Sequence, residues 1–101
     1  MAVDTDVPGE AAARIAREAV SFPDVVELST GSFGTLNTPV PGGHVRGVAV
    51  RGDSVEVGVV LRYGRPLPEI VAELRQGLTP AAGGRVVHIF VEDVIAGLGG
   101  G

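Results

Sequence analysis

The chain lacks cysteine, lysine and tryptophan, and its 101 residues include only three Phe and one Tyr. Without cysteine it can form neither a disulfide framework nor a thiolate metal site. No apolar run approaches the roughly 20 residues that a helix needs to cross a bilayer. Residues 1–6 are acidic where a secretory signal would be basic. We therefore expect a cytoplasmic protein that reaches the membrane periphery, if at all, through a partner.

The charge balance bounds the range of partners. The eight basic residues are all arginine, and the formal net charge is −4 at pH 7. A negative chain is a poor electrostatic match for a phosphate backbone, so we expect no nucleic acid. The length predicts a single domain with a modest core.

Strict alternation marks the strand around which the chain is organised. Apolar residues occupy every second position of residues 55–63, which is the period of a strand with one face in a core. Residues 48–50 predict a shorter strand of the same kind, and residues 51–54 the turn between the two. Residues 25–29 and 85–93 also read as strands.

Two segments have helical spacing. Residues 10–21 carry an apolar stripe opposite a charged face, and residues 69–78 carry a second stripe. Pro and Gly are frequent in residues 31–43 and 79–84, which predicts a long loop and a flexible connection. We expect residues 1–9 to be disordered, residues 10–94 to form the domain and residues 95–101 to be a flexible Gly-rich tail.

The assembled order is α-β-β-β-α-β, an α/β (α+β) two-layer sandwich with a small mixed sheet and both helices on one face. We expect the last strand to lie beside residues 45–51. The face of the sheet away from the helices is then a candidate docking or self-association surface, and the long loop a candidate contact loop. An exposed sheet with scattered apolar residues remains the plain alternative. The candidate face comprises Ala49, Val60, Arg62, Val86, His88 and Phe90, and the candidate loop residues are Phe33, Leu36 and Asn37.

No motif of an enzyme, metal site or cofactor site emerges. His88 and Glu92 are four residues apart on one strand, roughly 13 Å, which is too far to chelate one ion. The segment GSFG (residues 31–34) matches the Gly-x-x-Gly loop of KH-type nucleic-acid-binding domains, but it contains no basic residue. We predict no catalytic, metal or cofactor residues and keep a KH-like nucleic-acid-binding domain as the alternative.

Three segments resemble a known family in order and spacing. They are IAREAVSFPDVV (residues 15–26), LRYGRPLPE at the strand-to-helix junction (residues 61–69) and VEDV (residues 91–94). Together they are similar to the alkaline-shock envelope stress response family of Gram-positive bacteria, as a short actinobacterial-type member. The chain departs from the family pattern in residues 3–7, where the family has a first strand, and in the short connection at residues 79–84.

The resemblance implies a non-enzymatic protein without a cofactor. Its family role would be to support the cell envelope under stress. It would act by homo-oligomerisation, by docking to a membrane-anchored protein, or by both. The family brings no catalytic residues, so none are assigned.

Overall fold

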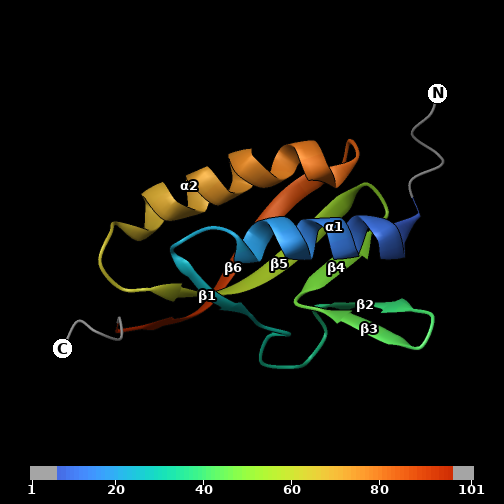
Figure 1. The fold of residues 1–101 in the computed structure, drawn as a ribbon, viewed down its shortest axis with the longest axis horizontal. Coiled ribbons are helices and arrows are strands. Elements are labelled where there is room, and N and C mark those ends of the chain that lie inside the picture. The colour runs from blue at the N-terminus through green and yellow to red at the C-terminus, as the bar shows by residue number, and fades with distance from the viewer. Residues whose placement is uncertain (1–6, 97–101) are drawn as a thin grey trace.

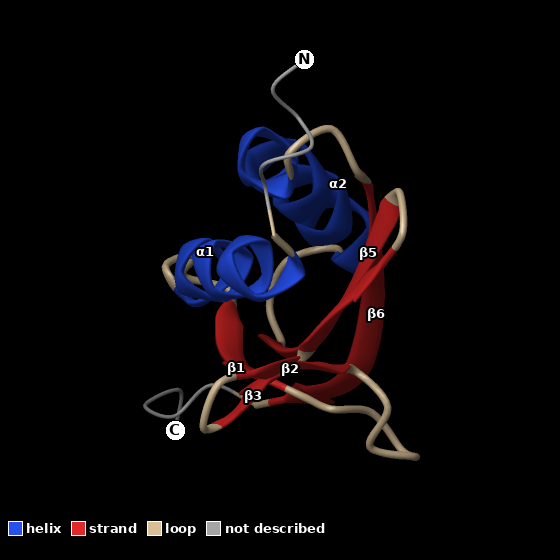
Figure 2. Ribbon diagram, turned by 90° about the vertical axis from the view of Figure 1, so that its right-hand side faces the viewer, coloured by secondary structure: helices blue, strands red, loops and turns tan. Residues whose placement is uncertain are grey.

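A mixed sheet carries both helices on one face in the computed structural model, which describes residues 7–96 (Figures 1 and 2). The predicted fold class, with two helices and a small mixed sheet, is confirmed. The elements of this two-layer body are α1 (Pro8–Val20), β1 (Val25–Leu28), β4 (Val48–Arg51), β5 (Ser54–Arg62), α2 (Leu67–Leu78) and β6 (Val86–Ile95).

The long strand β5 is the centre of the sheet. It pairs with β1 and β4 in antiparallel fashion and with β6 in parallel. Because β6 follows β5 over its whole length, β1 and β4 share the opposite edge of β5. The expectation that the last strand lies beside residues 45–51 was wrong. A helix that follows β5 can return the chain in parallel to the strand's free edge, whereas the other edge is already filled by the β4–β5 hairpin.

The core lies between this sheet and the helices. The alternating residues of β5 are fully buried, which confirms its periodicity. Most of each helical stripe is buried as well, but Val20 at the end of α1 is 54% exposed, and Ala16 and Val71 are only partly buried. Alanine-rich α1 can lie close to β4 because its small side chains keep the backbones near each other. The largest buried side chains are Ile15, Val48, Val55, Val57, Val59, Leu61, Ile70, Leu74 and Leu78.

Two segments that were expected to be loops form regular secondary structure. Residues 31–43 contain β2 (Asn37–Val40), which pairs with β3 (Gly43–Arg46) in a two-stranded sheet. The connection after α2 is a 3-10 helix, η2 (Thr79–Ala82), whose alanines are buried in the core. In both cases tertiary packing overrides a composition rich in Pro and Gly.

The boundaries of the domain also shift slightly. Helix α1 begins at Pro8, two residues before the expected start, because proline suits the first turn of a helix. Strand β6 continues to Ile95. The expected N-terminal disorder and Gly-rich tail fall mostly on residues 1–6 and 97–101, outside the described residues.

Candidate functional site

The predicted docking face is exposed only near β6. The side chains of Val86, His88 and Phe90 point away from the helices and are exposed, and Phe90 keeps 42% of its surface accessible. Arg62 is partly exposed, and its Nε donates a hydrogen bond to the carbonyl of Pro23 at 3.3 Å. The exposed apolar surface therefore lies along one edge of the sheet.

Two residues of the predicted docking face are buried and cannot contact a partner. Ala49 and Val60 are buried, with 1% and 8% of their surface accessible, so the expectation that they lie on an open face was wrong. The segment between β1 and β2 crosses this side of the sheet, and Leu36 packs over Gly58. Since Gly58 has no side chain, Leu36 and the chain at Ser29 can approach the backbone of β5 closely.

The three predicted contact-loop residues have different positions. Leu36 is 6% exposed and anchors the loop on its own sheet, so it is not a contact residue. Asn37 is partly buried, and its side-chain amide donates to the carbonyl of Gly34 at 2.7 Å. Phe33 is 91% exposed. Of the three, only Phe33 presents a large free side chain.

Phe33 and Phe90 border the same shallow hollow, here called the Phe90 hollow. The sheet contributes residues of β5 and β6 to its lining, and the loop that Leu36 anchors contributes the others. Its carboxylates are those of Glu56 and Glu92, and Glu56 is paired with Arg51 at 2.9 Å. The lining residues are Gly31, Ser32, Phe33, Thr35, Leu36, Glu56, Phe90 and Glu92.

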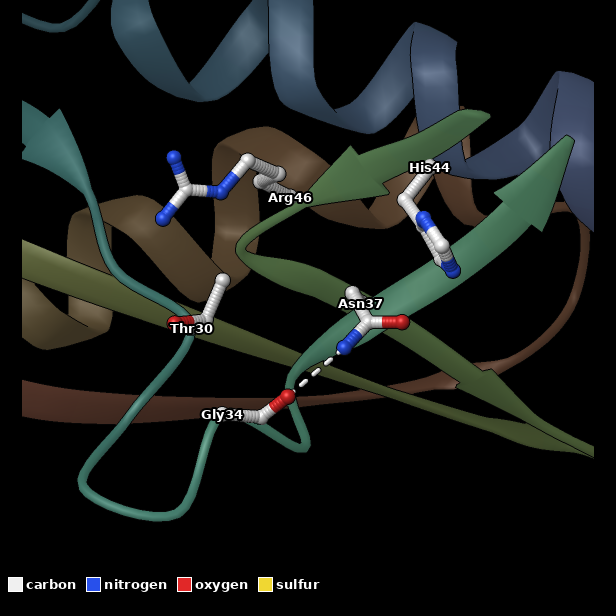
Figure 3. Close-up of a pocket in the computed structure, with 5 residues that line it drawn as sticks. All are labelled: Thr30, Gly34, Asn37, His44 and Arg46. Atoms are coloured by element: carbon white, nitrogen blue, oxygen red, sulfur yellow. Dashed lines mark hydrogen bonds between the residues drawn. The ribbon is translucent and has the colours of Figure 1, made fainter. Parts of the chain in front are cut away.

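A second hollow lies on the other side of the same loop, and sequence reasoning did not identify it (Figure 3). It is lined by Thr30, Gly34, Asn37, His44 and Arg46. The two basic residues lie two positions apart on β3, so their side chains share a face of that strand. The hairpin that brings them to Gly34 was predicted as a loop, so no local signal pointed to this grouping.

An ion cluster lies at the strand-to-helix junction, at the opposite end of β5 from the β4–β5 turn. The guanidinium of Arg65 contacts Asp24 at 2.6 Å and Glu73 at 2.6 Å, and it lies 3.8 Å from Glu69. The hydrogen bond from Arg65 lowers the pKa of Glu73, and hydrogen bonding to Glu73 raises the pKa of Arg65. Nearby Tyr63 is 77% exposed rather than inward-facing as the alternation of β5 predicted.

The described residues hold no metal-binding arrangement. Across residues 7–96, no three His, Asp or Glu side chains are grouped so that they could hold an ion. His44 lies on β3 and His88 on β6, in different sheets. The part of the chain that the structure describes also has no helix long and apolar enough to span a membrane.

The chain was compared with known proteins at three levels. No family model, no curated protein and no solved structure matches it. The resemblance to the alkaline-shock family therefore remains a prediction from the three sequence segments.

Proposed function

We propose that this protein is a non-enzymatic structural or interaction protein of the cell-envelope stress response. It acts by self-association, by docking to a membrane-anchored protein partner, or by both. The envelope role follows from the resemblance of residues 15–26, 61–69 and 91–94 to the alkaline-shock family. The observation that supports an interaction role is a set of exposed apolar side chains, here called the apolar edge: Val86 and Phe90 on the edge strand β6, and Phe33 in the loop beside Phe90.

The apolar edge has the composition of an interface centre. Aromatic side chains are enriched at interfaces, where they bury a large area for little loss of conformational freedom. Phe33 and Phe90 account for two of the four aromatic residues in the chain. The loop that carries Phe33 is held on the sheet by buried Leu36, so the ring is presented from a fixed base. Such an arrangement favours binding of a protein surface.

The test is the mass of the purified protein in solution, measured by light scattering across a concentration series. We expect a dimer or larger assembly that Phe90→Asp weakens by roughly a hundredfold, since an unpaired carboxylate at an interface centre costs several kcal/mol. Because Phe90 is partly exposed in the single chain, the variant should still fold as a monomer, which circular dichroism checks. Tyr63→Asp is the matched control, since it replaces an exposed aromatic residue outside the apolar edge and should leave the mass unchanged.

A strict monomer would remove self-association and leave docking to a membrane-anchored partner. In that case the wild type, but not Phe90→Asp, should retain a specific protein from membrane extracts. Equal retention by both would remove the apolar edge as the docking surface.

Nucleic-acid binding is a second candidate, and one observation favours it. The structure brings His44 and Arg46 beside Gly34 of the Gly-x-x-Gly segment, and Phe33 of that segment is exposed for base stacking. The net charge of −4 counts against it. Titration of single-stranded RNA at several salt concentrations decides: binding that falls steeply with salt and is lost in Arg46→Ala would support this candidate, and no binding at low salt would exclude it.

A further inference from the structure

We infer that two copies of this chain associate through their β6 strands, which pair edge to edge. The strands run antiparallel about a two-fold axis at Phe90, so that the two sheets become one continuous sheet. This inference rests on the proposed self-association and specifies its surface and register.

The outer edge of β6 is unpaired. Among residues 7–96, β6 pairs with β5 alone. The amide of Val86 donates to the carbonyl of Asp53 and the carbonyl of Ile95 accepts from the amide of Tyr63, so both ends of the strand direct their backbone groups toward β5. Alternate residues of a strand direct these groups to opposite sides, so residues 87, 89 and 91, counted from Val86, direct theirs outward; the register shift after Val91 reverses the alternation before Ile95.

Up to Val91, the sequence of β6 does not protect this edge. Natural edge strands are commonly short, or carry lysine, proline or inward-pointing charges that prevent pairing with another chain. Strand β6 has ten residues, and its first six, VVHIFV, contain no proline, lysine, arginine or carboxylate; Glu92 and Asp93 follow them. A shift in register with β5 between Val91 and Asp93 bends only its C-terminal part. The part up to Val91 is straight, so residues 89 and 91 offer an open template for a further strand, and Glu92 lies where the bend begins.

The side chains of β6 select one register. With the axis at Phe90, the two Phe90 rings face each other and His88 of each copy lies opposite Glu92 of the other. All three side chains lie on the side of the sheet away from the helices. The imidazole of His88 can therefore donate to the carboxylate of Glu92 in the other copy, once on each side of the two Phe90 rings. An axis at His88 or Glu92 would place like groups opposite each other. An axis at Ile89 would place His88 opposite Phe90 and lose the complementarity.

Pairing in this register would also bury apolar side chains on the face of β6 that is turned toward the helices. Ile89 and Val91 pack against the core but are only partly buried, and within residues 7–96 no strand pairs with β6 on its outer side. In the inferred dimer Ile89 of one copy and Val91 of the other form a hydrogen-bonded pair, and their side chains cover each other. Both faces of the strand thus gain apolar contacts.

Cysteine crosslinking tests the register directly, because the chain has no cysteine of its own. In the inferred dimer the two residues at position 90 are a non-hydrogen-bonded antiparallel pair with Cα atoms about 4.5 Å apart, which is within disulfide range. Under mild oxidation Phe90→Cys should give a covalent dimer. His88→Cys alone should not, since its partner is residue 92, whereas the double variant His88→Cys, Glu92→Cys should crosslink again.

Charge reversal tests the same register with Phe90 in place. His88→Glu should weaken dimerisation roughly tenfold, because two attractive pairs become repulsive, and adding Glu92→Arg should restore it. A wild-type dimer in which Phe90→Cys fails to crosslink, or His88→Cys crosslinks equally well, would overturn the β6 register and leave self-association standing. A strict monomer would overturn both, and docking to a membrane-anchored partner would then be judged separately by retention from membrane extracts.

Discussion

The hydroxyl of Thr38 donates a hydrogen bond to the carbonyl of Val48 at 2.7 Å. The same oxygen accepts from the amide of Val50 at 3.1 Å, so one side chain occupies the position of a neighbouring strand at the free edge of β4. Thr38 is polar but buried, with 5% of its surface exposed. This contact attaches the β2–β3 hairpin to the main sheet and so helps to fix the loop that carries Phe33.

Thr38→Val should therefore destabilise the protein. The isosteric change keeps the volume but leaves a buried carbonyl and a backbone amide without their partner, which costs about 1–3 kcal/mol of unfolding free energy. Urea unfolding measures the loss, and amide exchange should become faster at Val50. Thr35→Val, at an exposed position, is the control and should change little. Unchanged exchange at Val50 would contradict the proposed attachment.

Gly58→Ala should also destabilise the protein, for a steric reason. A Cβ at this position would meet the carbonyl oxygen of Ser29, and it would lie 2.7 Å from Cδ1 of Leu36. The loop would have to lift from β5, at a cost of about 1–3 kcal/mol. Gly43→Ala is the matched control, because a Cβ there has nothing within 4 Å. Chemical denaturation of both variants checks the difference, and equal stabilities would show that the loop is not tightly packed.

The sequence predicted what depends on periodicity. Alternation in residues 55–61 identified β5 and its buried side, because one face of a strand in a small domain must enter the core. Alternation in residues 85–93 likewise placed Val86, His88 and Phe90 on the exposed side of β6. These inferences need only the local pattern.

What the sequence could not predict depends on distant contacts. Alternation says which way Gly58 and Val60 point, but not that Val60 is buried or that Leu36, from the chain before β2, packs on Gly58. The β2–β3 hairpin was missed because Pro39 argues against a strand. The grouping of His44 with Gly34 was missed for the same reason.

The ion cluster at Arg65 predicts a pH dependence of stability. The pKa of Glu73 is lower in the folded protein than its ordinary value, so the folded state favours the carboxylate. The stabilisation is therefore fully present above the ordinary pKa of a glutamate and is lost as the pH falls through the lowered value. Arg65 has a raised pKa and stays charged throughout this range, so Glu73 sets the window.

Glu73→Gln should lower the melting temperature at neutral pH, by no more than a few degrees because the pair is solvent-exposed. The difference from the wild type should shrink as the pH is lowered below the range in which glutamate ionises, and it should also shrink in high salt. Glu69→Gln is the control, since its carboxylate lies 3.8 Å from Arg65 and should contribute less. Thermal unfolding followed by circular dichroism at several pH values makes the comparison. A difference between wild type and Glu73→Gln that is the same at acid and neutral pH would mean that the ion pair does not stabilise the strand-to-helix junction.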